Sequence, residues 1–154
     1  SFHSTPIERI TIPSKLKRIC NEAFSSCQSL RHFKIPSDSE FQVIETLNFN
    51  SILIESLSIP ASVCEFEDGW CSCAENLTKV TIDHRNQYFM ICTEDERLVI
   101  DKSELTNYIF DVLLFASCDI TDVTIPSYIK RIGSFAFEYC SFEKFLSSST
   151  NRTN

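Results

Sequence analysis

The sequence predicts a repeat solenoid, α/β or mainly β in class, with parallel strands in about 5–6 coils of ~23 residues and one inserted hairpin. Two recurring patterns predict the coils, and a break in their period predicts the hairpin. The first pattern is a strand phrase, apolar-x-x-apolar-x-apolar, which a proline closes in most copies. The second is an aromatic residue three positions before a small apolar one.

The strand phrase occurs five times in full and begins a sixth time, with starts 23, 24, 23, 43 and 22 residues apart. Alternation within the phrase sends apolar side chains to a core and the residues between them to solvent. Proline lacks an N–H and fixes φ, so it ends a strand and begins a turn. A unit of this size cannot bury its own apolar face, so neighbouring units must bury each other's. The copies are Ile7/Ile10/Ile12, Leu30/Phe33/Ile35, Ile54/Leu57/Ile59, Leu77/Val80/Ile82, Ile120/Val123/Ile125 and the start Phe142/Phe145.

The aromatic pattern follows the strand phrase in the same order throughout, which makes the two patterns independent evidence for one repeat. In a coil these side chains fill the wall of the core opposite the strand. Four of the small residues are cysteines, which should form a ladder of buried side chains at equivalent positions. The pairs are Phe24/Cys27, Phe49/Ile52, Trp70/Cys73, Phe115/Cys118 and Phe137/Cys140.

The interval from Asp83 to Leu114 breaks the period. It begins with Asn86-Gln-Tyr-Phe89 and contains the β-prone runs 98–102 and 107–110 around a polar linker. Two such runs predict a hairpin inserted between coils, with a degenerate repeat as the alternative. We therefore expect one solenoid domain over residues 1–146, with an irregular insertion at about 83–114. A polar tail at 147–154 follows, where a longer array could have been truncated.

Charge excludes two classes of partner. The formal net charge of −7 argues against binding nucleic acid, which requires a basic face, and against docking on anionic lipid. No run approaches the ~18–20 apolar residues of a membrane-spanning helix, so we expect no membrane span in this segment. The first residues carry no signal-like pattern and already lead into a repeat.

The strand phrase with its proline, the apolar pair after it (Leu16 and Ile19) and Ala23-Phe24-x-x-Cys27 resemble the BspA-type leucine-rich repeat, also called the leucine-rich repeat 5 family. The resemblance covers residues 7 to about 146, and the insertion is similar to one that recurs in the family. It implies a curved solenoid with parallel strands on its concave side. Members are commonly cell-surface or extracellular proteins of mucosal microbes, associated with adhesion and protein–protein contacts. The family offers no catalytic residues, so we expect no enzyme.

A binding surface is expected on the concave face, where outward strand positions form five rows that merge along the solenoid. Arg9, Arg31, His32 and Lys34 predict a basic patch on an otherwise acidic protein, and Lys79 lies on the same face. An acidic protein or a sulfated glycan, on a host cell surface or in the extracellular matrix, would suit this patch. Two alternatives stay open, an ordinary mixed surface that maintains solubility and a structural spacer without its own ligand. The rows are Glu8/Arg9/Thr11, Arg31/His32/Lys34, Glu55/Ser56/Ser58, Thr78/Lys79/Thr81 and Thr121/Asp122/Thr124.

The eight cysteines raise a third alternative, a metal or redox module. Cys64, Cys71 and Cys73 with His84 would be the ligands, but C-x-C is a tighter spacing than zinc sites use, and the ladder already accounts for Cys73. No nucleophile motif or phosphate loop is present. We therefore expect no cofactor and no metal.

Two sequons, Asn76-Leu-Thr78 and Asn151-Arg-Thr153, are possible N-glycosylation sites at Asn76 and Asn151 if the chain is secreted.

Overall fold

The computed structural model describes residues 5–19, 23–24, 27–45, 53–72, 74–104 and 109–141, and the backbone of 144–147. Within these ranges the chain forms strands and turns and no helix. No described helix is therefore long and apolar enough to cross a membrane. Cys20, Phe49, Ile52, Cys73, Phe142, Asn151 and the tail from 148 onward lie outside the described residues.

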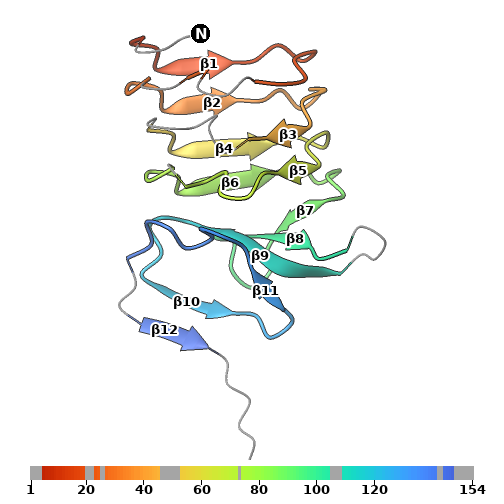
Figure 1. Ribbon diagram of the computed structural model, residues 1–154, viewed down its shortest axis with the longest axis vertical. Helices are drawn as coiled ribbons and strands as arrows, with labels where there is room; N and C mark the ends of the chain where they lie inside the picture. Colours follow the sequence, from red (N-terminus) through yellow and green to blue (C-terminus); the bar gives the residue numbers. More distant parts are fainter. Residues whose placement is uncertain are drawn as a thin grey trace, which may run out of the picture.

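The first four strand phrases form one parallel sheet. Its strands are β1 (Arg9–Thr11), β2 (His32–Lys34), β4 (Ser56–Ile59) and β6 (Lys79–Ile82), in that order (Figure 1). Equivalent phrase positions pair in register, because Ile10 lies opposite Phe33 and Leu57 lies opposite Val80. The predicted parallel-strand solenoid is confirmed.

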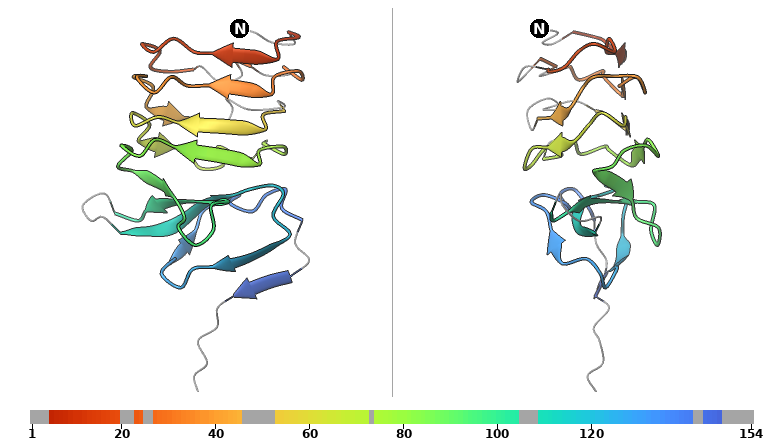
Figure 2. Two further views of the ribbon diagram at one scale, coloured as in Figure 1. Left: turned by 180° about the vertical axis from the view of Figure 1, so that it is seen from behind. Right: turned by 90° about the vertical axis from the view of Figure 1, so that its right-hand side faces the viewer.

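A second, smaller sheet forms the other side of the coils. β3 (Val43–Ile44) and β5 (Glu65–Phe66) pair in parallel on the side of the stack opposite β1, β2, β4 and β6 (Figure 2, right). Apolar side chains fill the space between the two sides. Phe24 packs edge-on against Phe33 at 5.5 Å between ring centroids, and Trp70 packs against Phe66 at 4.5 Å.

The predicted hairpin is confirmed and is larger than expected. β7 (Phe89–Ile91), β8 (Leu98–Lys102) and β9 (Phe110–Ala116) form an antiparallel meander, and β11 (Arg131–Ile132) joins β9 in parallel. β10 (Asp122–Ile125) carries the fifth phrase and pairs in parallel with β12 (Lys144–Ser147), the sixth.

The β8–β9 hairpin divides the hydrophobic interior in two. Val99 and Phe115 belong to an N-terminal core with Leu57, Trp70 and their neighbours. The alternate residues Leu98, Ile100 and Leu113 belong to a C-terminal core that also contains Ile120 and Val123. A strand buried on both faces reads as a continuous apolar run, which accounts for the sequence Leu98-Val-Ile and Val112-Leu-Leu-Phe-Ala.

The prediction of one merged face is wrong for its fifth row. Thr121, Asp122 and Thr124 belong to the β10 segment, whose strand pairs with β12 and not with β6. The cause is the insertion, because β7–β9 and their connecting segment come between β6 and β10 (Figure 1). The first four rows share one sheet as predicted.

Candidate binding surface

The outward side chains of β1, β2, β4 and β6 form a polar surface, here called the polar strand face. Strand alternation builds it, since in β2 Phe33 is buried whereas Lys34 beyond it is exposed. The register then aligns these side chains across the sheet. Across the sheet, Arg9 lies opposite His32, His32 opposite Ser56, and Ser56 opposite Lys79. Two residues further along the strands, Thr11 lies opposite Lys34 and Ser58 lies opposite Thr81.

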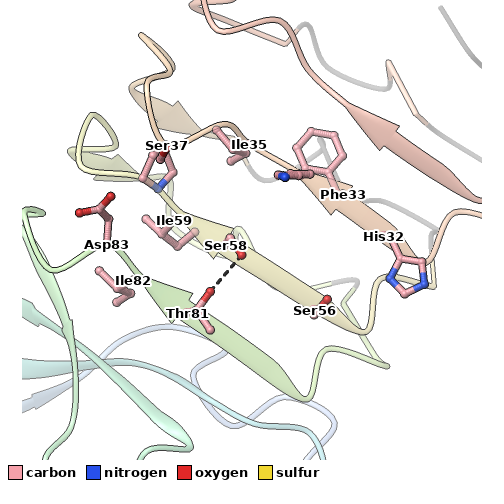
Figure 3. Close-up of a pocket in the computed structure, with 12 residues that line it drawn as sticks. His32, Phe33, Ile35, Ser37, Ser56, Ser58, Ile59, Thr81, Ile82 and Asp83 are labelled. Carbon is pink, nitrogen blue, oxygen red and sulfur yellow. Dashed lines mark hydrogen bonds between the residues drawn. The ribbon is translucent and has the colours of Figure 1, made fainter.

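A hollow of about 460 Å³ opens on this face over β2, β4 and β6 (Figure 3). The hydroxyls of Ser56, Ser58 and Thr81 line it, and Thr81 Oγ1 donates to Ser58 Oγ at 3.0 Å. His32 and Lys34 of β2 contribute an imidazole and an ammonium group. Buried or half-buried apolar residues complete the lining, among them Ile35, Ile59 and Ile82.

Asp83 stands where β6 ends, at the same hollow, and it is held as a carboxylate. Arg85 Nε and Nη2 donate to its two oxygens at 3.0 and 2.8 Å. These hydrogen bonds lower the pKa of the Asp83 carboxyl well below its usual range. Arg85 Nη2 also reaches the Ser37 carbonyl at 3.5 Å, so this ion pair ties the end of β6 to the coil that follows β2.

The five predicted ligand-binding residues lie on one surface but differ in charge environment. Arg9, His32 and Lys79 lie at equivalent positions of their strands, and Lys34 lies two residues after His32 on β2. Arg31 precedes β2, and its Nη1 donates to Glu55 Oε1 at 2.9 Å, with both side chains half exposed. Glu55 therefore compensates the charge of Arg31 and lowers the net positive charge of the predicted patch.

Asn76 lies in a turn just before β6 and is half-buried. Its sequon partner Thr78 is exposed, and Thr78 Oγ1 donates to the Glu55 carbonyl at 3.4 Å. Glycosylation at Asn76 stays a prediction.

The cysteines form packing contacts along the stack. Cys27 is fully buried, Cys118 Sγ donates to the Ala74 carbonyl at 3.2 Å, and Cys140 Sγ donates to the Ser117 carbonyl at 3.3 Å. The last two thiols therefore each contact the residue beside the equivalent cysteine of an earlier coil. The prediction that these side chains are buried holds for Cys27 and is wrong for Cys118 and Cys140, which are half-buried.

Among the described residues no three metal-ligating side chains cluster together, and Cys73, one of the candidate ligands of the metal alternative, lies outside them. Cys71 Sγ donates to the Phe135 carbonyl, and Cys64 Sγ to that of Gln42. Burial raises the pKa of the Cys71 thiol to about 12 and that of Cys140 to about 11. Thiols held protonated in this way are poor nucleophiles and poor metal ligands at neutral pH.

Sequence reasoning missed a second cavity, of about 660 Å³, between β6 and the insertion. Val80, Ile91, Arg97 and Phe115 are among the residues that line it. The sequence feature that could have predicted this cavity is the interval of 43 residues between the starts of the fourth and fifth phrases. This long interval displaces the strand that would otherwise pair with β6.

Three solved structures share this fold. The pneumococcal vaccine antigen PcpA superposes with a TM-score of 0.76 at 20% identity, covering 92% of this chain and 34% of its own. A leucine-rich cell surface protein from Faecalibacterium prausnitzii A2-165 gives 0.68 at 18% identity, covering 90% of this chain and 41% of its own. A leucine-rich repeat protein from Eubacterium ventriosum gives 0.68 at 20% identity, covering 94% and 42%. The chain thus spans well under half the length of each of these proteins.

No curated protein matches the sequence closely enough to count as a relative. The family model of the BspA-type leucine-rich repeat region matches in six copies, over residues 1–111 and 110–153. That match extends over nearly the whole sequence and agrees with the parallel coils of the structure. The chain belongs to the BspA-type leucine-rich repeat family.

Proposed function

We propose that this chain is part of a recognition scaffold that binds a protein or a sulfated glycan through its polar strand face. The family is consistent with a protein-binding scaffold. The observation that carries the proposal is the hollow of about 460 Å³ on that face, where hydroxyl, imidazole and ammonium groups converge. Such convergent polar groups over an apolar lining are typical of ligand sites.

The chemistry of the hollow favours a ligand rich in hydrogen-bond acceptors. Ser56, Ser58, Lys34 and His32 can all donate, whereas the one carboxylate, Asp83, is already paired with Arg85. Acidic side chains and sulfate groups offer acceptors and the complementary charge. An acidic protein or a sulfated glycan therefore fits this surface better than a basic partner.

The names of two similar structures, a leucine-rich cell surface protein and a vaccine antigen, suggest the setting. We propose that the parent protein is displayed at a cell surface and that this segment contributes to adhesion to host cells or extracellular matrix. Proteins of this repeat type are typically non-enzymatic scaffolds, and we propose the same of this chain.

Binding of the purified chain to extracellular-matrix proteins, sulfated glycans and host cells tests the proposal. Lys34→Glu, in the hollow, is the diagnostic variant, and Lys15→Glu is its control, since Lys15 is exposed in a turn and does not line the hollow. We expect Lys34→Glu to weaken saturable binding by about tenfold or more and Lys15→Glu by less than about twofold. No binding by the folded chain, or equal loss in both variants, would favour the spacer alternative.

A further inference from the structure

One edge of β6 carries unpaired backbone groups. Its ladder to β4 runs from Lys79 N, which donates to the Glu55 carbonyl at 3.2 Å, to Asp83 N, which donates to the Ile59 carbonyl at 2.9 Å. In a parallel ladder alternate residues bond the same neighbour, so the N–H and C=O of Val80 and Ile82 point away from β4. Among the described residues no hydrogen bond reaches these four groups.

The next coil lies alongside the segment just before β6 and then diverges from it. Cys118 N donates to the Leu77 carbonyl at 3.2 Å, and Ser117 Oγ donates to the Thr78 carbonyl at 2.8 Å. Beyond this point the connection between β7 and β8 intervenes. Its Arg97 accepts from Ser117 N at 3.0 Å and donates through Nη2 to the Asp122 carbonyl at 3.3 Å, which holds the start of β10. β10 pairs with β12 instead of β6.

A cavity of about 660 Å³ lies beside this free edge. Its apolar lining includes Val80 and Ile91, both half-buried, and Phe115, which is buried in the N-terminal core. Charges of both signs surround it, Lys79 and Arg97 against Glu96 and Asp119. The cavity adjoins the hollow on the polar strand face, since Thr81 and Ile82 line both. It differs from the hollow because Val80 lines the cavity alone.

We propose that the free edge of β6 and this cavity form a docking site for an extended peptide segment of a partner protein, which adds to the sheet as a further strand. An extended backbone supplies donors and acceptors at the spacing that Val80 and Ile82 present. Its alternate side chains would meet the apolar lining, and those between them would meet solvent. The balanced charges around the cavity suit a polypeptide better than a sulfated glycan, which would need a basic site. This site goes beyond the proposed function and does not depend on it.

The probe is a fluorescent synthetic peptide with the sequence of residues 119–128, the phrase that would follow β6 in an uninterrupted array. Two further peptides carry N-methyl groups on alternate residues, in opposite phases. In a peptide bound as a strand, the amide N–H groups of every second residue face β6, and those of the residues between them face away from it. We expect one methylated peptide to bind the full 154-residue chain like the parent peptide and the other to bind about tenfold more weakly, because it loses its strand bonds.

Val80→Pro is the matched variant of the chain. It removes an N–H that faces the cavity, a position at a sheet edge where proline is tolerated. We expect it to bind the parent peptide about tenfold more weakly, whereas Lys34→Glu binds the peptide normally. Because Val80 also packs against the N-terminal core, Val80→Pro should lower the unfolding temperature, so binding is compared at a temperature where both chains are folded. Equal binding of both methylated peptides would overturn the proposal even if Val80→Pro failed to fold. A dimer of the chain abolished by Val80→Pro would also overturn it, since a second copy would then occupy the edge.

Discussion

At the scale of single residues, the strand phrase assigns opposite roles to neighbouring positions. Phe24 is 5% exposed and packs on Phe33, whereas Thr11 on β1 points to solvent. We expect Phe24→Ala to lower the free energy of unfolding by about 3–5 kcal/mol, through lost burial and the cavity it leaves. Thr11→Ala should change it by less than about 0.5 kcal/mol. Urea unfolding, followed by the fluorescence of buried Trp70, measures both. Similar small losses in the two variants would contradict the assignment of inside and outside.

The buried thiols make stability depend on pH at the alkaline end. Burial raises the pKa of Cys71 from 9.0 to about 12, so the folded chain keeps a proton that the unfolded chain releases. The stabilisation is therefore complete below pH 9 and is lost as the pH rises from 9 towards 12. We expect unfolding midpoints to fall across this interval and to fall less steeply in Cys71→Ala. An identical slope in the variant would show that other groups cause the loss.

At the scale of elements, Asn86 fixes the start of the insertion to the preceding coil. Its Nδ2 donates to the Pro60 and Val63 carbonyls at 2.8 and 2.9 Å. Its Oδ1 accepts from the backbone N–H groups of Tyr88 and Phe89, both at 2.9 Å. One half-buried side chain thus serves four backbone groups of two consecutive segments.

We expect Asn86→Ala to destabilise the chain by about 1–3 kcal/mol, because the Val63 carbonyl and the Phe89 N–H, both of buried residues, lose the partner that Asn86 supplies. The neighbouring Gln87→Ala, at an exposed position, should cost less than about 0.5 kcal/mol. Thermal unfolding of the two variants measures the difference. If both cost the same, the hydrogen bonds of Asn86 do not anchor the insertion.

The sequence predicted the strands whose pattern repeats. It did not predict the position of an aromatic residue where the same spacing fits both a turn and an inserted strand. The phrase at Leu57 and Val80 fixed the sheet and its register. The Phe115/Cys118 pair kept the right order, but Phe115 lies on the inserted strand β9, whereas Phe24 and Trp70 lie in turns. Both positions deliver an aromatic ring to the same core, so spacing alone could not separate them.

The candidate site was predictable only in part, because its charges depend on contacts between coils. Alternation placed His32 and Lys34 on the outward face, as the structure does. The pairing of Arg31 with Glu55 joins residues 24 apart and requires the register of β2 and β4. The cavity beside Val80 arises from the path of the insertion, which no pattern within the phrase encodes.

At the scale of the whole molecule, the inserted hairpin acts as a partition between two cores. A repeat array normally transmits damage from each coil to its neighbour. Here the layer between the fourth and fifth phrases is the β8–β9 hairpin, whose alternate residues belong to different cores. Each half of the stack packs against this hairpin through residues such as Phe115, which packs on Trp70 at 5.6 Å. A few direct hydrogen bonds also join the halves, such as that from Cys71 Sγ to the Phe135 carbonyl.

Hydrogen exchange measured by mass spectrometry tests this division. Ile120 is fully buried in the C-terminal core, and Ile120→Ala should cost about 2–5 kcal/mol. We expect faster exchange over residues 110–141 and unchanged exchange in β2 and β4, because the hairpin keeps its packing against the N-terminal core. Phe115→Ala, on the partition itself, should accelerate exchange on both sides. If Ile120→Ala instead accelerated β2, β4 and β9 equally, the stack would unfold as one cooperative unit and the hairpin would not separate its halves.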